Sequence, residues 1–389
     1  MMPLANAYVP MERPRQVEPF HPLEARVCSA CQLVQLVHLE SPDALFGEYA
    51  YVSSYSHSWL KHCRQFAERM TGELALTAAS QVVEIGSNDG CLLRPFQQLG
   101  IPVLGVDPAA NVAKVAVQTG IPTDAAFFGK TYAEHLTARG LSADLLIANN
   151  VLAHVPDLND FVAGLKVLLK PGGLITVEFP HLLRLMQYKQ FDTIYHEHVS
   201  YLSLAAAQRI FSAHGLCVTD VEELPTHGGS LRLFVRHDDS RSQISVNIER
   251  LIDAERDFGL QRMETYRDFD RQLRAAKLSL LQFLLDAKRR GARIAGYGAP
   301  AKATTLLNFC GIDVDFIEFT VDRNPRKQHH FIPGTRIPIL HPDAISMHRP
   351  DYVLIFPWNL RDEITQQLSD VRRWGGQFVV PIPEVEVLP

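Results

Sequence analysis

Two acidic residues and a glycine-rich turn form the first group whose types and spacing could bind a ligand. A β-branched segment at 81–85 contains Glu84 and runs into Gly86-Ser87-Asn88-Asp89-Gly90, and a second segment at 102–106 ends at Asp107. Glycine allows a sharp turn or a close approach to a ligand, and amides at the start of the next helix face that ligand. Because doubly wound sheets bind ribose hydroxyls with an acid at the tip of the second strand, the pattern predicts an adenosine site.

This turn favours S-adenosylmethionine (SAM) over a dinucleotide. It lacks the G-x-G-x-x-G spacing of dinucleotide-binding proteins and a lysine for a pyrophosphate. A strand at 144–148 ends in two asparagines, where a SAM-binding sheet lines the sulfonium, and Pro171-Gly172-Gly173 is the turn typical before the next strand. A turn in a sheet without a cofactor is the alternative. The residues predicted to bind SAM are Glu84, Gly86, Asn88, Gly90, Asp107, Asn149 and Asn150.

A dense set of proton-handling groups follows the strand predicted at 173–178. Tyr195, His196, Glu197 and His198 place a phenol, two imidazoles and a carboxylate within four residues. A carboxylate beside a histidine holds one tautomer and raises its basicity. On these residues alone, acid–base chemistry, a metal site on the two histidines and a polar helix start all stay open.

A second glycine turn lies near the C-terminus. The segment 296–301 fits G-x-G-x-x-A, and Asp322 follows at roughly the distance of a ribose-binding acid, so an NAD site stays open. Nearby polar and stacking side chains could hold a nucleotide, or could be ordinary capping and packing residues. They are Lys302, Asn308, Trp358 and Asn359.

The N-terminal residues carry two weaker signals. Cys28 and Cys31 form a Cys-x-x-Cys pair, which is half of the four ligands that a structural zinc needs. No second pair exists among the six cysteines, so free thiols or a redox pair are the alternatives. An aromatic-polar run at 49–56 includes Tyr49 and Tyr51, and by itself is more typical of a surface loop.

Composition limits the function classes. The 389 residues suffice for two or three domains, and the net charge of −5 offers no basic field for nucleic acid. No apolar run has the length of a membrane span. Few paired cysteines and no signal-peptide pattern favour a cytoplasmic protein.

The order of the predicted elements gives the fold class. Alternating strands and helices up to about residue 235 indicate a parallel α/β sheet, which ends in antiparallel strands at 216–223 and 230–236. One or two helices are expected at 240–290, and a second alternation follows with strands at 293–297, 316–322 and 352–356. We therefore expect an irregular N-terminal lobe (1–65), a Rossmann-like SAM domain (66–238), and a helical connector with a second Rossmann-like domain (239–389).

Taken together, these segments resemble the sugar C-methyltransferases, over nearly the whole chain. The resemblance rests on Met2-Pro3-Leu4-Ala5-Asn6, Cys28-x-x-Cys31, 84–90, Phe191-Asp192-x-Ile194-Tyr195-x-Glu197-His198, His227-Gly228-Gly229-Ser230-x-Arg232, 296–302, 308–311 and Trp358-Asn359. It implies a class I SAM-dependent methyltransferase domain that methylates C-3 of a nucleoside-diphosphate-linked 4-keto deoxyhexose through an enolate.

The resemblance also implies roles for individual residues. His198 is the expected base and Glu197 its orienting partner, while Tyr195 or His154 stabilises the enolate oxygen. Tyr49 and Tyr51 are expected at the substrate, and the 296–308 loop contacts the nucleotide instead of NAD.

One departure concerns zinc. Family members carry a further Cys-x-x-Cys pair upstream, whereas this chain starts at the Met-Pro-Leu-Ala segment. Either the start is truncated or the zinc site has been lost, so we expect at most a partial zinc site at Cys28 and Cys31. Two rival functions are an NAD-dependent nucleotide-sugar oxidoreductase, which would leave the first glycine turn without a role, and a non-catalytic scaffold.

Overall fold

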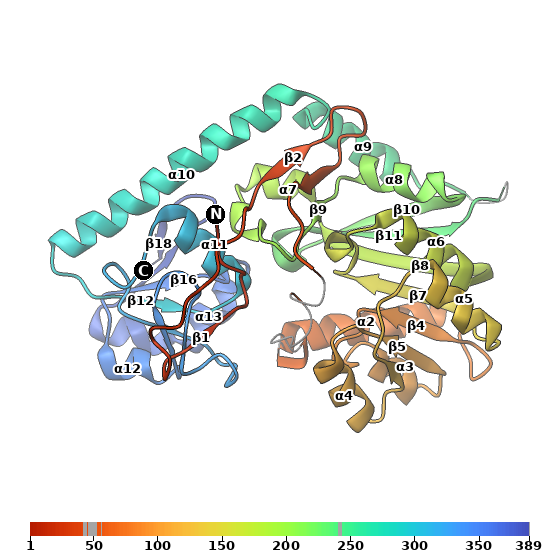
Figure 1. Ribbon diagram of the computed structural model, residues 1–389, viewed down its shortest axis with the longest axis horizontal. Helices are drawn as coiled ribbons and strands as arrows, with labels where there is room; N and C mark the ends of the chain where they lie inside the picture. Colours follow the sequence, from red (N-terminus) through yellow and green to blue (C-terminus); the bar gives the residue numbers. More distant parts are fainter. Residues whose placement is uncertain (42–44, 46–52, 56, 240–242, 389) are drawn as a thin grey trace.

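Two α/β units make up most of the chain, and a long helix connects them. The computed structural model describes residues 1–41, 45, 53–55, 57–239 and 243–388. Figure 1 shows α10 (Met263–Arg289) running along one side of the molecule from the first unit to the second. The shorter helix α9 (Val246–Phe258) precedes it, so the expected connector at 240–290 consists of two helices.

The first unit is built on a seven-stranded sheet in the order β10-β11-β8-β7-β4-β5-β6. Six strands run in the same direction, and β11 lies antiparallel between β8 and β10. This is the strand order of a class I methyltransferase, so the predicted fold class is confirmed. The strands are β4 (Val82–Ile85), β5 (Val103–Val106), β6 (Thr123–Asp124), β7 (Ala143–Asn149), β8 (Leu169–Pro180), β10 (Leu216–Leu224) and β11 (Ser230–His237).

Helices cover both faces of this sheet because their apolar stripes complete two buried clusters. One cluster lies under α2, α3 and α4, and the other under α5, α6, α8 and α9. These helices are α2 (His57–Glu73), α3 (Leu93–Gln98), α4 (Ala110–Gln118), α5 (Lys130–Ala138), α6 (Leu158–Leu168) and α8 (Leu204–Ala213). The short α7 (Leu182–Gln187) packs instead against the N-terminal strands.

The second unit has an eight-stranded sheet in the order β1-β14-β15-β13-β12-β16-β17-β18, with a parallel centre from β15 to β17. Helices α10 and α11 contribute to one apolar cluster and α12 and α13 to another. The elements are β12 (Ile294–Tyr297), α11 (Ala301–Cys310), β13 (Thr320–Val321), β14 (His330–Phe331), β15 (Pro338–Leu340), α12 (Ala344–His348), β16 (Tyr352–Ile355), α13 (Arg361–Gln367), β17 (Gln377–Val380) and β18 (Glu386–Leu388).

The N-terminal residues are shared between the two units. Strand β1 (Val9–Pro10) pairs with β14 at the edge of the C-terminal sheet, whereas β2 (Ala25–Val27) and β3 (Val34–Leu36) form a small sheet with β9 (Ser200–Tyr201). The division at residues 65 and 238 stays a prediction.

Two local predictions differ from the structure. The strand expected at 316–322 is reduced to Thr320–Val321, because the amides of Phe316 and Ile317 both donate to the Asp313 carbonyl in a turn. The turn expected at Pro171-Gly172-Gly173 lies inside β8, where Gly172 has a φ of +78° and the pairing with β7 changes register.

Candidate active site

The turn after β4 requires glycine at both of its ends. Gly86 has a φ of +69° and its amide donates to the Val106 carbonyl, 2.7 Å away, while an added Cβ would overlap the Val151 side chain. Gly90 has a φ of +76°, and a Cβ there would lie 2.9 Å from Ile121. The first βα turn is therefore held tightly against its neighbours.

Asp107, at the end of β5, fixes the shape of this turn. Its Oδ2 accepts a hydrogen bond from the Asn88 amide (2.8 Å) and its Oδ1 one from the Ala109 amide (2.9 Å). Burial raises the pKa of the carboxyl, and these two bonds oppose that shift. The carboxylate thus ties the glycine turn to the start of α4, in addition to any contact with a ribose.

Buried polar atoms without partners gather at the same sheet edge. Among the described residues, nothing bonds to Glu84 Oε2, Ser87 Oγ, either amide atom of Asn149, or Asn150 Oδ1. A buried polar atom left unbonded costs about 1–3 kcal/mol, so this cluster indicates a polar ligand. The ammonium, carboxylate and ribose hydroxyls of SAM supply the complementary groups. Burial, reinforced by Cys91 and Asp107, raises the pKa of Glu84 well above its usual value.

Replacing Asp107 by alanine should weaken SAM binding about 5- to 150-fold, equivalent to about 1–3 kcal/mol. The reason is that both amides that shape the turn lose their acceptor. Isothermal titration calorimetry measures the change, with Asp370→Ala, an exposed carboxylate of the C-terminal unit, as the matched control. Equal affinities of the two variants would show that Asp107 does not organise the site.

His198 is held as one neutral tautomer. Its Nδ1–H donates to the Thr193 carbonyl (2.9 Å), and the Tyr195 hydroxyl donates to its Nε2, also at 2.9 Å. The phenol and imidazole rings lie 4.1 Å apart. Burial lowers the pKa of His198 well below its ordinary value, with a further contribution from His154. The Nε2 lone pair is consequently a proton acceptor at neutral pH.

His154, in the loop after β7, lies against His198. The two imidazole centroids are 4.8 Å apart, and His154 Nδ1–H donates to the Glu197 carbonyl at 2.7 Å. Burial lowers the pKa of His154 to about 4. The cluster therefore joins two neutral imidazoles and a phenol.

Glu197 and His196 point to partners other than those expected. Both ring nitrogens of His198 are engaged by Thr193 and Tyr195, so these two residues orient the ring. The Glu197 carboxylate accepts instead from Asn6 Nδ2 at 2.6 Å. His196 Nε2–H donates to the Pro22 carbonyl. In the described part of the chain, no three or more His, Cys, Asp or Glu are grouped to hold a metal ion.

Residues 191–198, which contain the predicted base His198, are called the base loop. Residues of the C-terminal unit meet this loop at Asp192. Trp358 Nε1–H donates to Asp192 Oδ2 (2.7 Å), and the Lys302 ammonium lies 4.3 Å over the Trp358 ring while donating to Asn359 Oδ1 (3.0 Å). Asn308 lies elsewhere, since its amide donates to the Thr304 and Pro333 carbonyls. Tyr49 and Tyr51 lie outside the described residues.

The sequence pattern predicts no role for His227 or for the ion-pair network of Glu178 beside it. His227 has a φ of +54°, and its ring centroid lies 6.1 Å from that of Trp59. Burial is the main cause that lowers the pKa of His227 to about 4. Glu178, fully buried at the end of β8, binds both His62 and Arg232. The motif that contains His227, Gly228, Gly229 and Arg232 could have pointed to this part of the site. No sequence motif marks His62.

The second glycine turn differs from the first. Asp322 accepts from the Ala299 amide (2.7 Å) and from the Asn324 amide (2.8 Å), as Asp107 does in its own unit. A Cβ on Gly298 would lie 2.7 Å from Pro357. No buried polar side-chain atom without a partner is found at this turn in the described ranges, so the observation that favours a cofactor at the first turn does not favour NAD here.

Cys28 and Cys31 occupy the tight turn between β2 and β3, and both are free thiols. Hydrogen bonds from the Cys31 and Ala30 amides lower the pKa of Cys28. Zinc needs four ligands, and the described residues around the pair do not supply two more. The part of this segment that the structure describes does not fit a closed zinc site.

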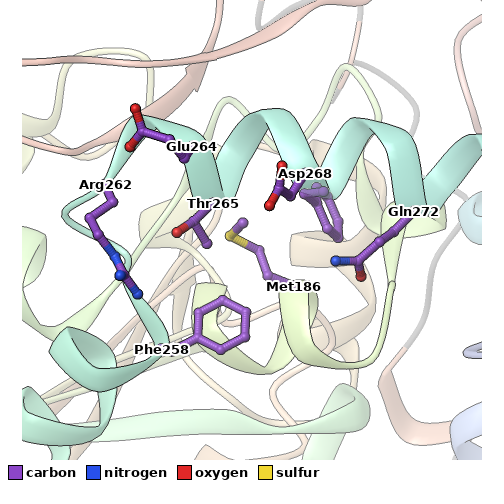
Figure 2. A pocket seen from close by; sticks show the side chains of 8 residues that line it. Met186, Phe258, Arg262, Glu264, Thr265, Asp268 and Gln272 are labelled. Atoms are coloured by element: carbon purple, nitrogen blue, oxygen red, sulfur yellow. The ribbon is translucent and has the colours of Figure 1, made fainter.

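A separate pocket of about 470 Å³ lies where α7 meets the corner between α9 and α10 (Figure 2). Apolar Met186 and Phe258 line it together with Arg262, Glu264 and Asp268. It contains none of the predicted site residues. None of the described helices is long and apolar enough to cross a membrane.

Comparison with known proteins identifies the family. The chain is 37% identical to the C-methyltransferase NovU of Streptomyces niveus over 386 residues, which cover 99% of this chain and 92% of that protein. The chain is a C-methyltransferase. Family descriptions match this C-methyltransferase in three parts, namely "Putative zinc binding domain" at 1–46, "Methyltransferase domain" at 55–221 and "C-methyltransferase C-terminal domain" at 225–383.

More distant relatives match a smaller part of the C-methyltransferase. The ubiquinone biosynthesis O-methyltransferase of Bartonella bacilliformis is 34% identical over 30% of this chain and 47% of its own length. The magnesium protoporphyrin IX methyltransferase of Synechocystis PCC 6803, solved with bound SAH, is 18% identical over 45% of this chain and 82% of its own, with a TM-score of 0.36. The full-length relationship to NovU and the matched "Methyltransferase domain" show that the C-methyltransferase is a SAM-dependent enzyme.

Proposed function

We propose that this enzyme methylates C-3 of a 4-keto deoxyhexose carried on a nucleoside diphosphate. The observation that carries the proposal is the locked neutral tautomer of His198, with its Nε2 lone pair directed into the cluster. The unpartnered polar side chains at the first sheet edge, Glu84, Ser87, Asn149 and Asn150, are called the cofactor cradle. His198 packs against His154, which follows the cradle asparagines in the loop after β7, and its pKa is lowered by burial, with a contribution from the charge of Lys302. The proposed site thus combines the cofactor cradle, a proton acceptor and a half-buried cation.

A new carbon–carbon bond requires a carbanion equivalent, which the carbon next to a ketone provides when it loses a proton. SAM, when bound, supplies an electrophilic methyl group. His198 Nε2 would take the C-3 proton after the substrate displaces the Tyr195 hydroxyl, which can then donate to the ketone oxygen. General-base assistance contributes roughly 10²–10⁴ to a rate, and stabilisation of the enolate oxygen about 10²–10³ more.

The C-terminal residues suit a nucleoside diphosphate. Burial lowers the pKa of Lys302, and the neighbouring Asp192 opposes that shift. An enclosed cation gains most from an anionic ligand, and the indole face offers a stacking surface. Asn359 and Trp358 hold the ammonium beside the base loop, where a diphosphate attached to the reacting sugar would lie.

The proposed location is the cytoplasm. All six cysteines are free thiols, which supports a reducing, cytoplasmic location.

Incubation of the enzyme with SAM and a nucleoside-diphosphate 4-keto-6-deoxyhexose should yield a C-3 methylated sugar, identified by mass and NMR. Methylation at an oxygen, or NAD-dependent reduction of the ketone without methylation, would contradict the proposal.

The lowered pKa of His198 predicts the pH dependence of proton abstraction. An ordinary histidine is half protonated at about pH 6.5, whereas His198 stays neutral, and therefore basic, at lower pH. The rate of C-3 proton exchange should stay level from about pH 8 to below about pH 6. Circular dichroism at each pH checks that the fold persists. A rate that halves at or above about pH 6.5 would contradict this expectation.

A further inference from the structure

A short segment at the N-terminus, residues 5–10, belongs structurally to the C-terminal unit. We call it the strap. Val9 pairs with Phe331 between β1 and β14, and the Thr304 hydroxyl on α11 donates to the Ala5 carbonyl at 2.9 Å. Ala5 and Val9 are 2% and 1% exposed. The strap is therefore anchored on the C-terminal unit at both of its ends.

One strap side chain, Asn6, reaches the base loop of the methyltransferase unit. Its Nδ2 donates to Glu197 Oε1 at 2.6 Å, and Glu197 is 4% exposed. The Tyr8 hydroxyl lies 3.2 Å from Asn6 Oδ1 and donates to the Ala299 carbonyl at 2.5 Å. Asn6 thus stands between a buried carboxylate of one unit and the glycine turn of the other.

Glu197 links Asn6 to the cluster of His154, Tyr195 and His198. Its side chain binds Asn6, and its backbone carbonyl accepts the Nδ1–H of His154 at 2.7 Å. The His154 ring in turn lies 4.8 Å from that of His198. A displacement of residue 197 would therefore change both the tautomer and the position of His154.

We propose that Asn6 is a positioning residue through which the C-terminal unit holds Glu197 and His154 in place for proton abstraction. Asn6 acts through Glu197 and does not touch the base itself. Lys302 and Trp358, the proposed nucleotide-binding residues, belong to the same C-terminal unit as the strap. Because of the Asn6–Glu197 contact, the cluster of His154, Tyr195 and His198 is fully assembled only when the C-terminal unit is docked on the methyltransferase unit. The catalytic part of this inference rests on the proposed function.

The first test needs no substrate. In the full chain labelled with ¹⁵N-histidine, the Nδ1–H signal of His154 is assigned by its loss in His154→Asn. Asn6→Ala should shift that signal or broaden it by exchange with water, with SAM affinity unchanged. The matched control is Asn159→Ala, on the exposed side of α6, which should leave the signal in place.

The second test reads the reaction. Asn6→Ala should slow C-3 proton exchange roughly 10- to 100-fold, as expected of a misplaced catalytic group. Asn6→Asp places a second carboxylate against Glu197, and because two adjacent carboxylates cannot both ionise, the pair takes up a proton. Exchange by Asn6→Asp should therefore be faster at about pH 6 than at about pH 8, whereas the wild type stays level.

An unchanged His154 signal in Asn6→Ala overturns the inference, as does a level pH dependence in Asn6→Asp with wild-type rates. If the wild type exchanges no C-3 proton, the proposed function fails, while the histidine signal still decides whether Asn6 positions the cluster.

Discussion

Replacement of His198 by asparagine should reduce C-methylation by about 10²–10⁴-fold, the contribution of a general base. Asparagine preserves a polar side chain near the Thr193 carbonyl but has no lone pair with the basicity of imidazole Nε2. SAM affinity should stay nearly unchanged, because the cofactor cradle lies at the ends of β4 and β7 and uses other residues. Steady-state methylation and calorimetry with SAM measure the two effects separately.

The matched control is His135→Asn, a histidine on the exposed face of α5 that should retain full activity. Loss of SAM binding in His198→Asn would mean that the substitution damages the cradle as well. Full methylation by His198→Asn would make His198 a structural histidine, and the base would then be His154 or Tyr195.

Gly86→Ala should abolish most SAM binding. The backbone there has a φ of +69°, which costs a residue with a Cβ about 1–2 kcal/mol. The added methyl also overlaps the Val151 side chain, so the turn and its amides must move away from the positions that face the cofactor. We expect the Kd for SAM to rise more than about tenfold, together with a lower melting temperature.

Gly140→Ala separates the cost of the positive φ from the effect of the steric overlap. Gly140 has a φ of +81° but open space around its Cβ position, so it carries the backbone cost without the steric overlap. It should lower the melting temperature and leave SAM affinity intact. If both variants lose SAM binding equally, the effect is one of stability, and the turn after β4 has no special part in the site.

The sequence predicted the elements whose signals are local. The β-branched segments before Gly86 and Asp107 became β4 and β5, and the base loop came together as a cluster because Tyr195 and His198 are three residues apart. Strong periodicity likewise located β10, β11 and the connecting helices.

Contacts between distant residues could not be predicted. Strand β1 has only two residues and pairs with β14 more than three hundred residues later, and no pattern in either segment specifies that partner. The expectation that Glu197 orients His198 relied on adjacency in sequence, whereas the carboxylate points to Asn6 and the loop backbone supplies Thr193 as the partner of the base.

The most direct test of the account is exchange of the C-3 proton in deuterated water with S-adenosylhomocysteine in place of SAM. No methyl group is available under these conditions, so the measurement isolates proton abstraction from a nucleoside-diphosphate 4-keto-6-deoxyhexose. The wild type and His135→Asn should exchange the proton, and His198→Asn should show no exchange above background. Exchange by His198→Asn at the wild-type rate would contradict the central claim that this histidine is the base.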